Sequence, residues 1–440
     1  MAETILGISA YYHDSAAALI RKGIPVAAAQ EERFSRKKHD ASFPSRAVAY
    51  VLEEAGLSME DIDAVAFYEK PYIKFERLLE TYHALAPRGL KSFLASVPVW
   101  IKEKLFQKSI LKNELTSLGA VKPPPILFPE HHLSHAASAF YPSPFDDAAI
   151  LTIDGVGEWD TTTIGFGEHD RIQVVRKLEF PHSLGLLYSS FTEWCGFRVN
   201  SGEYKLMGLA PYGRVNSGKA RDIRRKILDD LVDLRADGSF LLNMDFFDFA
   251  TGLTMCNRTR WLELFAIPRR VPETEPSSDI LDMARAIQDV TEEIVIRLAR
   301  TASQTTGKKN LVMAGGTALN CVANGKLLKE GLFEKIWIQP ASGDAGGALG
   351  AALAAWHIGY GKKRATVHKR DRMAGSYLGP EYCERDVLRL AERYDAPCKR
   401  YDDRALLSKD VAGLIAQGKV VGWFQGRMEY GPRALGNRSI

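Results

Sequence analysis

The stretch ILGISAYYHDSAAALI, residues 5–20, places two apolar segments on either side of a polar turn at residues 11–15. A third apolar segment, IPVAAAQ at 24–30, follows the short turn RKG. Apolar segments of this length separated by polar turns are typical of an antiparallel β-meander. The sequence therefore predicts that the chain opens with a meander, whose first hairpin is closed by the turn that contains His13.

A similar pattern returns about 146 residues later. Its apolar segments are ILTID at 150–154, TTTIGFG at 161–167 and RIQVVRKLEF at 171–180. At this offset Ile5 aligns with Leu151, and Asp14 aligns with Asp160. The distance is too long for a solenoid repeat, whose period is roughly 20–50 residues. The pattern instead suggests two copies of one domain type, although a match in pattern alone can arise by chance.

Composition restricts the class of protein. With 440 residues, 46% apolar and 25% charged, the chain is long enough for two or three globular domains. A net charge of +4 with scattered basic residues argues against nucleic-acid binding. The five cysteines form no C-x-x-C pair, which predicts a reducing, cytoplasmic location without a disulfide framework. No uninterrupted apolar stretch reaches 18 residues, so no membrane span is expected.

Further along the chain, strands lead into helices, which indicates an α/β fold. A long helix is predicted up to Gly307, with Ser277 or Ser278 at its start. Two strand-to-helix units follow, and a basic run near residue 368 marks a change in composition. We therefore predict three regions, at 1–145, 146–362 and 368–440.

HHLSHAASAF, residues 131–140, contains a candidate metal site. In a helix, His131 and His135 are four residues apart and lie on one face, where two imidazoles can share a cation. Asp154 ends an apolar strand, and Asp344 stands at a helix start. Two imidazoles and two carboxylates suit iron, zinc or manganese. The alternative is a buried, hydrogen-bonded histidine pair, with the two aspartates as turn or capping residues.

Glycine-rich loops and cations suggest anion binding. AGGTALN, 314–320, has Gly315 and Gly316 between a strand and a helix, and GDAGGALG, 343–350, repeats this design. Lys205 can neutralise phosphate charge. GRMEYGPRALGNR, 426–438, holds three arginines suited to phosphate or carboxylate, namely Arg427, Arg433 and Arg438. Together with the cation site these features favour a nucleoside triphosphate, while tight helix–strand packing and solvated loops remain the alternatives.

Eight ordered motifs together resemble a known family. They are GISAYYHDSAAALI, AAQEERFSRKKHDASFP, HHLSHAASAF, DGVGEWDTTTIG, EYKLMGLAPYG, AGGTALNCVANG, GDAGGALGAA and GPRALGNRSI. This set resembles the NodU/CmcH-type O-carbamoyltransferases. The resemblance implies a Kae1/TsaD-like first module, on the actin/Hsp70-like fold of duplicated ribonuclease-H-like domains. It also implies the start of an α+β YrdC/Sua5-like second module. Members normally continue past GPRALGNRSI, so the chain is expected to be a fragment that fails at the carbamoyl-phosphate step alone.

The resemblance also implies a reaction. The second module handles carbamoyl phosphate, and the first joins the carbamoyl group to AMP with ATP and passes it to a hydroxyl. His131, His135, Asp154 and Asp344 are then metal ligands, with iron expected and Mg²⁺ an option at the nucleotide. His13 assists transfer, plausibly as general base. The implied nucleotide contacts are Lys205, Gly315, Gly316 and Asn320, and the implied carbamoyl-phosphate contacts are Arg427, Arg433 and Arg438.

Several alternatives stay open at this point. A kinase or ATPase of the same fold would release ADP rather than AMP and pyrophosphate, and a nucleotide-binding module would bind ATP without turnover. The residues at 33–44 line the acceptor pocket or form a solvated loop. The sequence does not specify which compound carries the acceptor hydroxyl. It also leaves the oligomeric state open, with a homodimer as one option.

Overall fold

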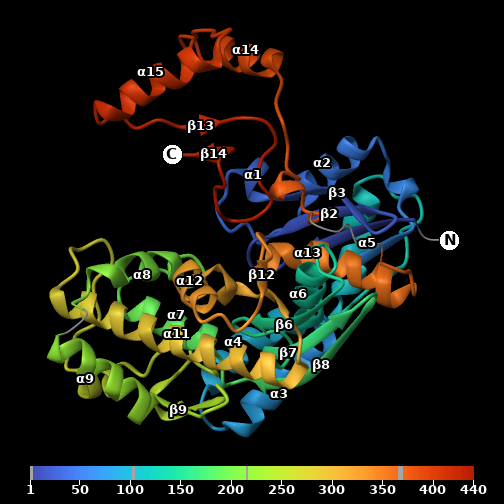
Figure 1. The fold of residues 1–440 in the computed structure, drawn as a ribbon. Helices are drawn as coiled ribbons and strands as arrows, with labels where there is room; N and C mark the ends of the chain where they lie inside the picture. The colour runs from blue at the N-terminus through green and yellow to red at the C-terminus, as the bar shows by residue number, and fades with distance from the viewer. Residues whose placement is uncertain (1–2, 102–104, 215–216, 365–369) are drawn as a thin grey trace.

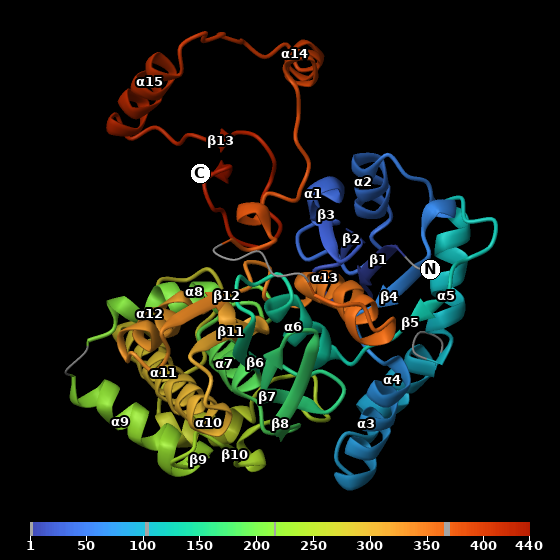
Figure 2. The same cartoon turned by 45° about the vertical axis from the view of Figure 1, so that its right-hand side comes forward.

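The computed structural model of the protein describes residues 3–101, 105–214, 217–364 and 370–440. Its body consists of two five-stranded sheets with helices on and between them (Figures 1 and 2). The strands of the first sheet are β1 (Thr4–Ser9), β2 (Ala16–Arg21), β3 (Ile24–Gln30), β4 (Ala64–Phe67) and β5 (Ile126–Leu127). Those of the second sheet are β6 (Asp147–Ile153), β7 (Asp160–Glu168), β8 (Arg171–Glu179), β11 (Asn310–Ala314) and β12 (Lys335–Ile338).

The two sheets share one strand order. It is β3-β2-β1-β4-β5 in the first sheet and β8-β7-β6-β11-β12 in the second. In each sheet three consecutive strands form an antiparallel meander, and the next two run parallel to the first strand of that meander. This is the ribonuclease-H-like sheet, present twice. The predicted duplicated, actin-like α/β fold is therefore confirmed.

The spacing between the two copies changes along the first hairpin. Ser9 pairs with Ala16 across the turn of the first copy, and Ile153 pairs with Thr162 across the turn of the second. The predicted offset of 146 thus holds for the second strand, whereas the offset of the first strand is 144. The second turn is two residues longer, and it is the turn that begins with Asp154.

Helices α6 (His131–Phe140) and α13 (Asp344–Ala354) lie side by side between the sheets (Figures 1 and 2). Helix α6 packs on β6, β7 and β11, whereas α13 packs on β1, β2 and β4. Helix α6 thus comes from the region 1–145 but covers the second sheet, and α13 comes from the region 146–362 but covers the first sheet. The chain exchanges these helices between the halves, and sequence order alone does not reveal such an exchange.

Glycines allow this close approach. A Cβ atom added to Gly350 of α13 would stand 1.8 Å from the carbonyl oxygen of Ser134 on α6. A Cβ atom at Gly7 of β1 would stand 1.8 Å from the carbonyl oxygen of Ala348 on α13. No side chain fits at either position, so α13 is held by backbone contacts on both sides.

The long helix α11 (Ser278–Thr306) begins and ends as predicted. Ser277 caps its first turn by accepting the N–H of Ile280, and Gly307 follows it in the left-handed conformation with φ 64°. It packs on β6 and β7 within the core that contains Leu151 and Ile153, the residues that point away from α6. No helix in the described parts of the chain is long and apolar enough to cross a membrane.

The remaining elements surround this body. The helices are α1 (Glu32–Ser35), α2 (Ser45–Ala55), α3 (Pro71–Ala84), α4 (Leu90–Trp100), α5 (Gln107–Ser117), α7 (Leu184–Trp194), α8 (Glu203–Leu209), α9 (Gly218–Lys226), α10 (Arg258–Phe265), α12 (Cys321–Lys329), α14 (Glu384–Arg393) and α15 (Arg404–Ala416). The short strands are β9 (Val232–Leu234), β10 (Phe240–Leu242), β13 (Trp423–Phe424) and β14 (Arg438–Ser439). Figure 2 shows α3 and α4 projecting from one side of the body.

The C-terminal segment touches the first half at a few points. The carbonyl oxygen of Leu378 accepts the N–H of Ala28 in β3, and the hydroxyl of Tyr430 donates to the carbonyl oxygen of Ala345. Beyond these contacts α14 and α15 extend away from the body, and neither helix buries a residue against the described chain (Figure 1). Of the stretch KVVGWF, residues 419–424, only Trp423–Phe424 forms a strand, β13. A YrdC-like fold for 368–440 stays a prediction.

Candidate functional site

Helix α6 and strand β6, which pack together at the second sheet, bring three polar side chains close to one another. Helix α6 begins at His131, so His131 and His135 lie on one face, as their spacing predicts. Strand β6 ends at Ile153, and Asp154 follows directly. The carboxylate of Glu158 accepts the backbone N–H of His131 at 3.0 Å, which satisfies a donor in the first turn of α6. The turn after β6, which contains Glu158, therefore fixes the start of α6 beside Asp154.

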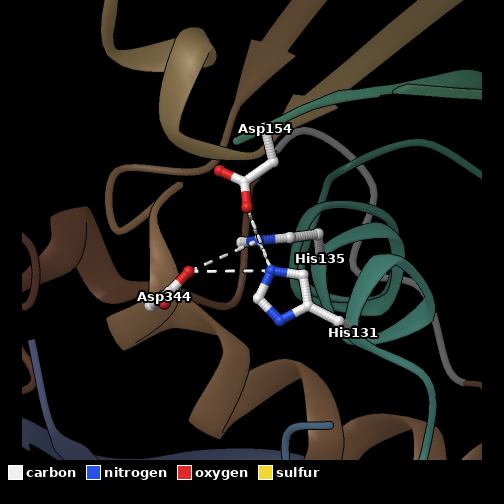
Figure 3. Close-up of side chains that lie close together, drawn as sticks. All are labelled: His131, His135, Asp154 and Asp344. Carbon is white, nitrogen blue, oxygen red and sulfur yellow. Dashed lines mark hydrogen bonds and ion pairs between the residues drawn. The ribbon is translucent and has the colours of Figure 1, made fainter. Parts of the chain in front are cut away.

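Asp344 completes the cluster from the other half, as the first residue of α13. The Nε2 atom of His131 lies 3.0 Å from Oδ2 of Asp154 and 3.7 Å from Oδ1 of Asp344. The Nε2 atom of His135 lies 3.6 Å and 3.9 Å from the same two oxygens. One ligand atom from each residue lies within 4.8 Å of all the others. Figure 3 shows both imidazoles and both carboxylates pointing at a common point.

The donor set fits a divalent cation. The two Nε2 atoms are only 3.0 Å apart, and two buried carboxylates face them, so a central cation would offset the carboxylate charge and accept both imidazole lone pairs. Burial would raise the pKa of Asp154, but hydrogen bonds from His131 and His135 hold this pKa well below its usual range. Burial would lower the pKa of His131, but Asp154 and Asp344 raise it to about 9. Two imidazoles with two carboxylates suit iron, zinc or manganese.

The rings are oriented by packing rather than through their second nitrogens. The Nδ1 atoms of His131 and His135 are buried and have no hydrogen-bond partner in the described part of the chain. The ring of Tyr68 packs edge-on against His131, with centroids 5.3 Å apart. His132 points away from the cluster, and its Nδ1 lies 2.7 Å from the hydroxyl of Thr152. His132 is thus held against β6 rather than being part of the cluster.

His13 stands next to the cluster, in the turn between β1 and β2. Its Nε2 lies 3.7 Å from Oδ2 of Asp344, and its Nδ1 lies 2.9 Å from Oδ2 of Asp14. Burial would lower the pKa of His13, but Asp344 and then Asp14 raise it to about 9. The structure therefore places the predicted transfer histidine beside the predicted metal ligands.

These residues line a cavity between the two halves. Its polar lining includes His13, Asp14, His39, His131, Asp154 and Asp344. Its apolar lining includes Leu186, Tyr188, Met207 and Leu319. The cavity can thus hold a ligand that has both charged and apolar parts.

With this geometry in place, the sequence can be compared with those of known proteins. The family profile described as carbamoyltransferase N-terminus matches residues 4–353, and that described as carbamoyltransferase C-terminus matches residues 412–440. This chain belongs to the carbamoyltransferase family. The resemblance noted from eight motifs is thereby confirmed.

Three relatives give the range of similarity within the carbamoyltransferase family. The uncharacterized protein sll1178 of Synechocystis is 57% identical over 99% of this chain and 70% of its own length. The nodulation protein NolNO of Sinorhizobium fredii is 35% identical over 98% of this chain and 58% of its own length. A 3'-hydroxymethylcephem-O-carbamoyltransferase of Amycolatopsis lactamdurans is 32% identical over 34% of this chain and 26% of its own length. The chain thus spans little more than half of NolNO.

The structure brings only some of the predicted nucleotide contacts of this chain to the cavity. Gly316 and Asn320 line it. Gly315 packs closely on β6: its φ is 92°, and a Cβ there would lie 2.3 Å from the carbonyl oxygen of Ile153. Asn320 caps α12 by accepting the N–H of Ala323. Lys205 is exposed on α8 and is not among the residues that line the cavity.

The three predicted arginines have different environments. Arg433 lines the cavity, 5.5 Å from the ring centroid of Tyr204. Arg427 donates to the hydroxyl of Tyr50 and to the carbonyl oxygen of Leu378. Arg438 donates to the carboxylate of Glu429. Arg427 and Arg438 therefore hold the C-terminal segment together, and a carbamoyl-phosphate site stays a prediction for all three arginines.

The sequence did not assign a role to two cavity residues. His39 lies in the segment 33–44, which was left open between a pocket lining and a solvated loop, and the structure places it in the cavity. Lys74 of α3 also lines the cavity and pairs with the buried Glu69 at 2.6 Å. A lysine on an inserted helix carries no signal of this kind, whereas the histidine in the motif RKKHD could have been proposed.

Proposed function

We propose that this protein activates a carbamoyl group with ATP and transfers it to a hydroxyl group of a small molecule or oligosaccharide. Water first cleaves carbamoyl phosphate into carbamate and inorganic phosphate. A carboxylate oxygen of the carbamate then attacks the α-phosphorus of ATP and gives carbamoyl adenylate and pyrophosphate. The acceptor hydroxyl then attacks the carbamoyl carbon, AMP leaves, and the hydroxyl proton is released. Each step conserves atoms and charge.

The observation that carries this proposal is that three residues of the four-residue cluster, His131, Asp154 and Asp344, line a cavity that also has apolar lining. A nucleotide combines the same properties, with charged phosphates and a flat base. Membership of the carbamoyltransferase family supports a carbamoyl group as the group transferred. The cephem relative, named as an O-carbamoyltransferase, supports a hydroxyl acceptor.

Each residue then has a defined task. His131, His135, Asp154 and Asp344 would hold the cation, which supplies positive charge for phosphate oxygens when bound. In its neutral form His13, which lies beside Asp344, can receive the proton of the acceptor hydroxyl at Nε2. The cavity between the halves would limit the access of water to a reactive adenylate.

The activation step is tested by the exchange of labelled pyrophosphate into ATP, measured on the complete protein. Exchange that depends on carbamoyl phosphate, with AMP as the adenine product of turnover, supports the proposal. Release of ADP would support a kinase or ATPase instead, and ATP binding without exchange or turnover would support a binding module.

The cation site is tested separately by metal analysis. Replacing both His131 and His135 by alanine should remove the bound transition metal, because only two carboxylates remain. His83→Ala, at an exposed position on α3, is the matched control and should keep the metal content unchanged. Equal metal content in the double variant and in the control would refute the assignment of the site.

A further inference from the structure

Asp14 contacts two histidines at once. Its Oδ2 lies 2.9 Å from Nδ1 of His13, and its Oδ1 lies 2.8 Å from Nδ1 of His39. An ionised carboxylate can only accept hydrogen bonds, so both rings donate their Nδ1–H to it. Hydrogen bonds from His13 and His39 lower the pKa of Asp14, although burial opposes this, so the ionised form is favoured. The opposite nitrogen, Nε2, is thereby given a fixed direction in each ring.

The two Nε2 atoms differ in what they meet. That of His13 faces Oδ2 of Asp344 at 3.7 Å. That of His39 is buried and has no hydrogen-bond partner among the residues that the structure describes, although the side chain lines the cavity. A buried polar nitrogen without a partner costs free energy, and a bound ligand can satisfy it.

The backbone shows that this arrangement is constrained. Asp14 and His39 have φ angles of 53° and 55°, in the left-handed region that residues other than glycine seldom adopt. The carboxylate of Glu32 accepts the backbone N–H of His39 at 2.8 Å, and Arg33 pairs with Glu32 at 2.7 Å. Conformations that the surroundings hold in this way are concentrated at functional sites.

We propose that Asp14 is a positioning residue. Through its one carboxylate it orients His13 toward Asp344 of the four-residue cluster and orients His39 toward the cavity. The role of His13 in transfer rests on the proposed function, whereas the orientation of the two rings does not. The ionisation of the rings does not enter the argument, because Nδ1–H donates to Asp14 whether or not Nε2 carries a proton.

The orientation is tested by nuclear magnetic resonance on the chain labelled with ¹⁵N-histidine. Long-range proton–nitrogen correlations should show a protonated Nδ1 in both rings, with signals assigned by His13→Gln and His39→Gln. In Asp14→Asn the amide can accept from one ring only, so at least one of the two rings should lose its protonated Nδ1. Asp61→Asn is the matched control, because Asp61 accepts hydrogen bonds from Ser58 at an exposed site. An unprotonated Nδ1 in either ring of the unaltered protein would overturn the proposal.

Turnover gives the second test, with water as the acceptor probe. Release of AMP from ATP and carbamoyl phosphate reports transfer, whereas pyrophosphate exchange reports activation. In Asp14→Asn the ratio of AMP release to pyrophosphate exchange should fall tenfold or more, because His13 no longer points correctly at the attacking water. A merely structural role would lower both rates in proportion, and that result would refute the positioning role. If the unaltered protein shows no exchange, the proposed function fails, while the resonance experiment still decides the orientation.

Discussion

Gly350→Ala is the substitution for which the structure makes the sharpest prediction. Gly350 lies where α13 crosses α6, and an added Cβ would stand 1.8 Å from the carbonyl oxygen of Ser134 and 2.9 Å from the backbone nitrogen of Ser138. Both of these atoms belong to the backbone of α6, so no side-chain rotation can relieve the contact. The two helices must move apart at this point.

The size of the effect follows from the contact. Because Cβ atoms almost never approach other heavy atoms closer than 3.0 Å, α13 has to move by about 1.2 Å relative to α6. Alanine gains about 0.5–1 kcal/mol over glycine within a helix, whereas overpacking a tight core costs about 1–3 kcal/mol. We therefore expect a net loss of up to about 2.5 kcal/mol in the free energy of unfolding, and a loss of about 1–3 kcal/mol relative to an alanine substitution that meets no neighbour. Since α13 carries Asp344, and metal sites tolerate about 0.2 Å, metal affinity should fall as well.

Urea unfolding and metal analysis check this prediction. Gly325→Ala is the matched control, because it also replaces a glycine within a helix, α12, but its added Cβ meets no atom within 4 Å. This control should be more stable than the unaltered protein by about 0.5–1 kcal/mol and should keep its metal. If Gly350→Ala is as stable as Gly325→Ala, the close approach of α6 and α13 is wrong.

Two further predictions concern other polar contacts. Asp282→Asn should lower the free energy of unfolding by about 1–3 kcal/mol near neutral pH, because the buried carboxylate accepts two charged hydrogen bonds from Arg214. Burial would raise the pKa of Asp282, but the hydrogen bonds from Arg214 lower this pKa in the folded state. The stabilisation by the ionised carboxylate is therefore present above about pH 4 and is lost as the pH falls further. Arg427→Ala should speed thermolysin cleavage within 381–425, because Arg427 joins Tyr50 to the carbonyl oxygen of Leu378.

Each of these predictions has a matched control. Asp279→Asn removes an exposed carboxylate on the same helix and should change stability by less than about 0.5 kcal/mol. A loss of stability in Asp282→Asn that does not shrink at low pH would contradict the role of the charge. Arg389→Ala, at an exposed position on α14, should leave cleavage unchanged, and equal cleavage in both arginine variants would show that Arg427 does not hold the segment.

The duplicated fold could be predicted because its signal is local. Each meander consists of consecutive strands, so the alternation of apolar segments and turns at 5–30 and 150–180 is visible in the sequence. The position of α13 could not be predicted, because chain order assigns it to the second half. Its glycine-rich stretch 343–350 was left open between a phosphate loop and tight packing, and in the structure Gly346 and Gly350 serve close backbone packing.

The pairing of His131 and His135 was predictable for the same reason, whereas the surroundings of Lys205 and of the arginines were not. His131 and His135 need only a helix to face the same way. Whether Lys205 lines the cavity depends on which face of α8 meets it, and Tyr204 and Met207 occupy that face. A motif shows that an arginine is present, but a guanidinium can donate to a backbone carbonyl as well as to a phosphate, and only the fold distinguishes these partners.

The exchanged helices explain why the cluster lies between the halves rather than within one. His131 and His135 stand on α6, which packs on the second sheet, while Asp344 stands on α13, which packs on the first. The four ligand atoms converge only while both sheets keep their positions relative to the crossing at Gly350. A cation held by these residues would therefore resist separation of the two halves, and any rearrangement that opens the cavity must act on the cluster at the same time.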